Sequence, residues 1–112
     1  LINTLKGLAI DPYKRKPVFD TIYAGVSGPA VKPIALRMVH EVSKAVSIPV
    51  IGLGGIVSGV DAIEFMMAGA SAIQIGTVNF FNPNAGKEVI EQMEQFCKEQ
   101  EIRHINEIIG II

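Results

Sequence analysis

The sequence predicts an α/β fold in which parallel strands alternate with helices, and three observations support this. Residues 48–53 form an almost continuous apolar run, typical of a strand buried on both faces of a parallel sheet. A second short apolar segment, residues 71–75, follows a helical pattern. Both segments end in glycine-bearing loops, Gly54-Gly55 and Gly76-Thr77, that lead into predicted helices. Because loops after the last two strands of a (β/α)8 TIM barrel form a common phosphate site, we expect that fold and that site.

The composition indicates a folded domain and argues against several kinds of partner and binding site. The chain has 112 residues, of which 49% are hydrophobic and 19% charged, as in a folded domain. The net charge of -1 gives no electrostatic reason to expect a nucleic acid or an anionic membrane as partner. No secretory signal or apolar run of membrane-spanning length is visible. The single cysteine excludes an internal disulfide framework and a multi-cysteine metal site, so we expect a cytoplasmic protein without a metal.

The length of the chain bears on the barrel prediction. A barrel needs roughly 200 residues or more, whereas this sequence contains about three βα units. It starts with Leu1-Ile2-Asn3, which lacks an initiator methionine and resembles the interior of a strand. We therefore interpret residues 1–112 as the C-terminal portion of one larger barrel domain. The alternative, a complete small domain, would leave its parallel strands with an unprotected edge.

The N-terminal quarter is predicted to hold a strand and a long connection. Leu1-Ile2 is expected to be a buried strand with Asn3 and Thr4 at its C-terminal end, where side chains reach the barrel mouth. An alternative role for Asn3, equally compatible with the sequence, is to cap a turn. Residues 5–27 are expected to form a hairpin with a basic, solvated tip, in a position to cover the top of the barrel.

Two helices are predicted around the central strand. Ser27 is expected to cap the first, with Pro29 in its first turn and its end near residue 46. Ser58 and Asp61 have the spacing of a capping box at the start of the second, and Gly69 is expected to end it. The N-terminus of that second helix offers free backbone N–H groups and a positive dipole end to an anion.

The last long helix is predicted to start at Asn82-Pro83. Its apolar face is expected to contain Val89, Ile90, Met93, Phe96 and Cys97. Cys97 is therefore interpreted as core packing, since a reactive thiol needs exposure and a positive neighbour. Glu101 occupies a position where glycine would end the helix better. The apolar tail, residues 108–112, is expected to dock against the barrel or a subunit.

Several motifs, in this order, resemble those of a known enzyme family. They are Ile2-Asn3-Thr4, Gly25-Val26-Ser27-Gly28-Pro29, Pro33-Ile34-Ala35-Leu36-Arg37, Ile51-Gly52-Leu53-Gly54-Gly55-Ile56, Ala68-Gly69-Ala70-Ser71 and Gly76-Thr77. The chain resembles the C-terminal part of dihydroorotate dehydrogenase, in the class I branch whose partner subunit passes electrons to NAD. Individually the glycine motifs occur in many flavin and phosphate barrels, but together and in order they are specific.

The resemblance implies an FMN-dependent oxidation of dihydroorotate to orotate, in which a proton leaves one ring carbon and a hydride passes from its neighbour to the flavin. It implies that the FMN phosphate is held by Gly54, Gly55, Gly76 and Thr77. It also implies backbone contacts to the flavin from Ile2 and Gly28, and hydrogen bonds to the pyrimidine from Asn3 and Thr4. The cysteine base of this branch is expected upstream, so no catalytic residue is expected here and the fragment alone should be inactive.

The resemblance also implies partners. They are a second, electron-transfer subunit that carries FAD and a 2Fe-2S cluster, and a homodimer within a heterotetramer. Two alternatives stay open: a flavin barrel like that of dihydropyrimidine dehydrogenase, which shares the Asn-Thr and Gly-Gly-Ile motifs, and a non-catalytic phosphate-binding half-barrel. The residues before Leu1 would discriminate among the three.

Overall fold

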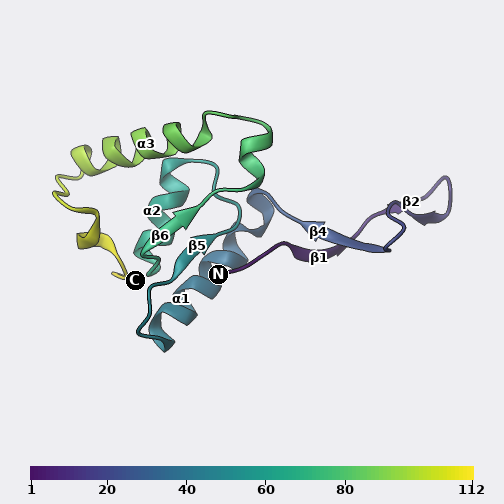
Figure 1. Cartoon of the computed structure of the whole chain (residues 1–112), viewed down its shortest axis with the longest axis horizontal. Helices are drawn as coiled ribbons and strands as arrows, with labels where there is room; N and C mark the ends of the chain where they lie inside the picture. The colour runs from purple at the N-terminus through teal and green to yellow at the C-terminus, as the bar shows by residue number, and fades with distance from the viewer.

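The computed structural model describes residues 1–112 and shows an α/β body from which a long β-hairpin arm projects (Figure 1). The overall dimensions are 56 × 33 × 17 Å. The body contains β5 (Ile51–Leu53), β6 (Ala72–Gln74), α1 (Lys32–Ala45), α2 (Gly59–Met67) and α3 (Ala85–Glu99). β5 and β6 are parallel, α1 packs beside β5, and α3 packs against α2. The predicted order of strand, glycine loop and helix is therefore confirmed for two parallel strands.

The arm is an antiparallel hairpin in two stages. It consists of β1 (Leu5–Leu8) paired with β4 (Tyr23–Val26), then β2 (Ile10–Asp11) paired with β3 (Lys16–Pro17). At the tip, the Asp11 carboxylate accepts hydrogen bonds from the backbone N–H groups of Tyr13 and Lys14, both at 3.0 Å. The hairpin with a solvated tip that the sequence predicts is thus confirmed.

Two expectations about strands are not met within residues 1–112. Leu1-Ile2 forms no strand: its one backbone link to the sheet is the terminal amino group of Leu1, which donates to the carbonyl of Ile51 at 2.9 Å. Nor is the central strand buried on both faces, since Ile51 is 42% exposed whereas Gly52 is buried. The reason is that helices cover only one face of the pair β5–β6. On that face a Cβ at Gly52 would lie 2.7 Å from the ring of Phe65.

The first helix begins differently from the prediction. A short 3-10 helix, η1 (Pro29–Val31), precedes α1, and its N-cap is Gly28 with a φ of 90°. Ser27 makes no capping hydrogen bond, so its predicted role as helix cap is wrong. Proline lies at the start of both η1 and α1. It lowers helix stability little there, because the first N–H groups of a helix have no internal partner.

α2 begins and ends as predicted. Ser58 Oγ accepts from the N–H of Asp61 at 3.2 Å, and the N–H of Ser58 donates to the Asp61 carboxylate at 2.9 Å, which forms a reciprocal capping box. At the other end Gly69 adopts a φ of 110°. A side chain there would also collide with Ser43 of α1. Glycine is therefore needed both to end the helix and to let α1 approach.

The main core lies between the helices and the sheet. Its buried members are Ile2, Ala35, Val39, Val50, Ile56, Ala62, Phe65, Ala68, Ala70 and Val89. Ile90, expected on the apolar face of α3, is instead 58% exposed. One residue along a helix is a rotation of about 100°, so Ile90 turns away when its neighbour Val89 faces the core. Cys97 is half-buried on α3.

The C-terminal tail docks on α2, as predicted. It contains the 3-10 helix η3 (Ile105–Ile108), and Ile108 is buried in a second cluster with Ile63 and Met66. The N–H of Gly110 donates to the carbonyl of Met66 at 3.0 Å. The tail therefore covers apolar surface at the end of α2. No helix in the chain has the length and apolar character needed to cross a membrane.

Glu101 ends α3 in a left-handed conformation with a φ of 55°. The N–H of Ile102 bonds to the Cys97 carbonyl at 2.8 Å and that of Glu101 to the Lys98 carbonyl at 3.3 Å, a Schellman motif that usually has glycine at this position. Because glycine adopts this conformation without Cβ strain, Glu101→Gly should stabilise the intact protein by about 0.5–1 kcal/mol in urea unfolding. Glu101→Ala keeps the strain and serves as control. Equal stabilisation by alanine would contradict the backbone explanation.

Candidate functional site

A cavity of about 170 Å³ lies at the carboxyl ends of β5 and β6, where the loops that follow these strands meet the segment before α1. Four stretches of the chain that are far apart in sequence contribute to its walls: residues 2–4, 26–31, 53–57 and 74–78. All the site residues that the sequence predicts line it, namely Ile2, Asn3, Thr4, Gly28, Gly54, Gly55, Gly76 and Thr77. The structure therefore brings the complete predicted set together, while their individual roles stay predictions.

The glycine pair after β5 is held tightly by its surroundings. Gly54 and Gly55 have φ values of 122° and 75°, which side-chain-bearing residues rarely adopt. A Cβ on Gly55 would lie 2.8 Å from both the Gly28 carbonyl oxygen and the backbone nitrogen of Lys32. The sequence suggested that these glycines make room for a ligand. The structure shows that Gly55 also makes room for the start of α1.

Other glycines leave open space. An added Cβ on Gly76 or Gly28 would meet no atom within 4 Å. Among the loop and turn hydrogen bonds, none uses the backbone N–H of Gly54, Gly55, Gly76 or Thr77 as donor. The loops after β5 and β6 thus hold backbone N–H groups without an acceptor in these loop and turn bonds, and open space lies beside Gly76 and Gly28.

The polar side chains of the cavity are neutral. Its lining contains no Asp, Glu, Lys, Arg or His, and its polar side chains are amides and hydroxyls. The side-chain oxygen of Asn3 accepts the N–H of Thr4 at 2.7 Å, so this side chain shapes the local turn as well as lining the cavity. The NH₂ group of Asn3 remains as a donor for a ligand.

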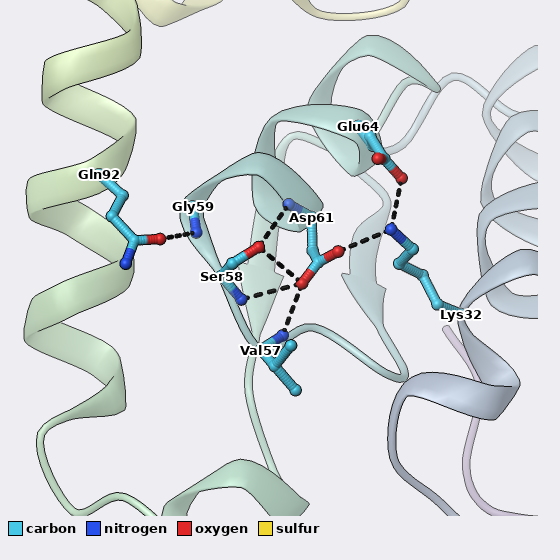
Figure 2. A network of polar contacts seen from close by, with 7 residues as sticks. All are labelled: Lys32, Val57, Ser58, Gly59, Asp61, Glu64 and Gln92. Atoms are coloured by element: carbon cyan, nitrogen blue, oxygen red, sulfur yellow. Dashed lines mark hydrogen bonds and ion pairs between the residues drawn. The ribbon is translucent and has the colours of Figure 1, made fainter.

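The N-terminus of α2 is not a free anion site, contrary to the expectation from sequence. Figure 2 shows that the Asp61 carboxylate accepts from the N–H groups of Val57 and Ser58, at 3.0 and 2.9 Å. The N–H of Gly59 donates to the side-chain oxygen of Gln92 at 2.6 Å. The protein's own side chains therefore occupy these donors, and the glycine pair is left as the predicted anion site.

Lys32 is a polar residue that the sequence reasoning missed. From α1, its ammonium group donates to Asp61 at 2.6 Å and contacts Glu64 at 2.9 Å (Figure 2). The hydrogen bond to Asp61, followed by that to Glu64, raises the pKa of Lys32 above its usual value. Burial alone would raise the pKa of Asp61, but hydrogen bonds from Lys32, Val57 and Ser58 outweigh it and lower that pKa. Both groups are therefore charged at neutral pH.

Comparison with known proteins decides the family. A family model described as Dihydroorotate dehydrogenase matches residues 1–97. The chain belongs to the dihydroorotate dehydrogenase family. It is 58% identical over its whole length to the dihydroorotate dehydrogenase B (NAD(+)) catalytic subunit of Petrotoga mobilis, of which it covers 37%. It is 60% identical over 110 residues to the protein of the same name from Thermoanaerobacter sp., of which it covers 36%. The chain therefore spans a little over a third of the length of these family members.

A solved structure shows the same fold. The crystal structure of DHODH from Eimeria tenella in complex with ferulenol superposes with a TM-score of 0.79 at 24% identity. The match covers 97% of this chain and 29% of that one. Membership of the dihydroorotate dehydrogenase family, inferred from the order of the motifs, is thus confirmed, and so is the α/β character of the chain.

Proposed function

We propose that the intact protein containing residues 1–112 is an FMN-dependent dihydroorotate dehydrogenase that oxidises dihydroorotate to orotate in pyrimidine biosynthesis. One observation carries the proposal: four distant segments of the chain place all eight residues implied by the family's motifs around one cavity. The names of the relatives support the activity. In this proposal electrons leave through a partner subunit with FAD and a 2Fe-2S cluster to NAD, in a heterotetramer built on a homodimer.

The sheet supports a barrel. Residues of β5 and β6 alternate, so that Gly52 and Ile73 face the helices while Ile51, Ala72 and Gln74 are exposed on the other face. In a (β/α)8 barrel the second face becomes the interior, which side chains of the remaining strands fill. We place residues 1–112 in the C-terminal portion of such a barrel, with the cavity at its carboxyl-end mouth.

The cavity fits the phosphate end of FMN. Neutral N–H and hydroxyl donors surround it, and no carboxylate lines it to repel a dianion. Its volume of about 170 Å³ lies below the roughly 300–1,000 Å³ of a typical ligand pocket, so these residues would hold part of the cofactor. When bound, FMN would supply the hydride acceptor. Gly54, Gly55, Gly76 and Thr77 would hold its phosphate, and Ile2 and Gly28 would contact the remainder through their backbones.

Gly76→Val tests the phosphate site. The Cβ that valine adds at this cavity-lining position meets no atom within 4 Å, so the intact protein should keep its melting temperature and lose most of its bound FMN. Flavin content is measured from the absorbance spectrum of the purified protein. Gly86→Ala on α3 is the control, because its new Cβ meets only Ile75 at an ordinary 3.8 Å outside the cavity. A folded Gly76→Val protein with normal flavin content would refute the placement.

Asn3→Ala tests the substrate wall. The NH₂ group of Asn3 can donate to a carbonyl oxygen of the pyrimidine ring, while its side-chain oxygen stays bonded to the N–H of Thr4. Leaving ring groups unpaired costs about 1–3 kcal/mol, so orotate affinity should fall about tenfold while FMN stays bound. Asn82→Ala is the matched control, since Asn82 caps a turn by accepting the N–H of Asn84 at 3.0 Å away from the cavity. If Asn3→Ala behaves like that control, with a lower melting temperature and unchanged orotate affinity, the substrate role is wrong.

A further inference from the structure

The position of Lys32 is unfavourable for α1 itself. It is the first residue of the helix, where the dipole favours negative charge, so a cation there works against helix stability. Its side chain instead crosses to α2, where its ammonium meets Asp61 at 2.6 Å and Glu64 at 2.9 Å. The three side chains bring opposite charges from two helices together, and Asp61 is the most deeply buried of them.

Asp61 links this ion pair to the backbone behind the cavity. One carboxylate oxygen binds Lys32, while the other accepts from the N–H groups of Val57 and Ser58 and from the Ser58 hydroxyl. Val57 lines the cavity and follows the glycine pair by only two residues. Figure 2 shows the carboxylate lying between the lysine and this segment.

Lys32 also meets the other end of the same segment. The Cα of Gly55 lies so close to α1 that an added Cβ would be 2.8 Å from the Lys32 backbone nitrogen. The segment of residues 54–58 thus lies close to the backbone of Lys32 at one end and is linked to its side chain, through Asp61, at the other. Lys32 itself lies outside the cavity lining, and its ammonium is paired with Asp61 and Glu64.

We propose that Lys32 and Asp61 are positioning residues that hold the segment of residues 54–58 in the conformation that binds the phosphate of FMN. The inference rests on the proposed function, since it assigns a purpose to the segment that this function places against the phosphate. Supporting groups of this kind fix the geometry of the groups that touch a ligand, and their loss weakens binding without removing any contact.

The test separates phosphate recognition from general stability. Intact protein is stripped of flavin and titrated with FMN and with riboflavin, which has the same ring system without the phosphate. Flavin fluorescence gives the two affinities, and the quantity compared between variants is the ratio of FMN affinity to riboflavin affinity. The ratio should fall about tenfold in Asp61→Ala and in Lys32→Met, as expected for the loss of a supporting group. Glu64→Gln is the control that should keep the ratio, because Glu64 contacts Lys32 but not the segment.

Each result has a defined meaning. Variants that keep the wild-type ratio, including those that lose affinity for FMN and riboflavin by the same factor, overturn the positioning role alone. A wild-type protein that binds both flavins equally overturns the proposed phosphate site, and the positioning role with it. If Asp61→Ala fails to fold, Lys32→Met carries the test, since it leaves the capping box of α2 intact.

Discussion

Gly55→Ala should lower the free energy of unfolding of the intact protein by about 2–4 kcal/mol and remove its flavin. Two separate costs contribute. The φ of 75° at this position strains any residue with a Cβ, and the new methyl group would lie 2.8 Å from backbone atoms of Gly28 and Lys32. Backbone atoms cannot rotate away as a flexible side chain can, so the glycine loop and the start of α1 must move apart.

Urea unfolding and flavin content of the same preparation measure both effects. Gly76→Ala is the matched control for the unfolding measurement alone, because the same methyl group meets nothing within 4 Å there. Gly55 is a poor position for testing phosphate contact, because a substitution there destabilises the fold and flavin loss would not report on the contact alone. A Gly55→Ala protein as stable as the Gly76→Ala control would show that the close approach of α1 to the loop is wrong.

Phe65→Ala should lower the free energy of unfolding of the intact protein by about 3–5 kcal/mol, the largest effect expected of any single truncation in the core. Phe65 is the largest side chain that is completely buried, and its ring lies against the backbone of Gly52 on β5. Removing it leaves a cavity directly beneath the strand that leads into the glycine pair. The melting temperature and the urea midpoint of the intact protein should therefore both fall.

Tyr13→Ala is the control for that truncation. Tyr13 is 96% exposed at the tip of the arm, so removal of its ring should change stability by less than about 0.5 kcal/mol. If Phe65→Ala lowers stability no more than Tyr13→Ala does, β5 does not depend on packing from α2. A large cost at Tyr13 would mean that the tip is buried by another part of the intact protein.

The features that sequence predicts well are those with local causes. The capping box of Ser58 and Asp61 and the glycine stop at Gly69 each depend on residues within a few positions, and both are present. The parallel pair β5–β6 follows from two apolar runs separated by one helical pattern. The cavity could be predicted because glycine loops after parallel strands meet at one edge of the sheet.

The features that sequence misses depend on partners far along the chain. Lys32 and Asp61 are 29 residues apart, and Gly59 and Gln92 are 33 apart. No local pattern indicates that these side chains meet, so the N–H of Gly59 looked free, whereas the predicted capping box already accounts for the N–H of Ser58. Ser27 fails as a cap for a different reason: the chain turns at Gly28, whose φ of 90° places the helix start one residue later.

The neutral lining of the cavity has a consequence for the physical character of binding. A site that holds an anion with lysines or arginines weakens as ionic strength rises, because salt screens the attraction between separated charges. Here dipolar N–H groups and hydroxyls would replace such charges. Under the proposed function, the share of phosphate binding that these residues supply should therefore depend little on salt concentration and strongly on the shape of the two loops. Steric fit, more than electrostatic attraction, would then set how long the anion stays bound.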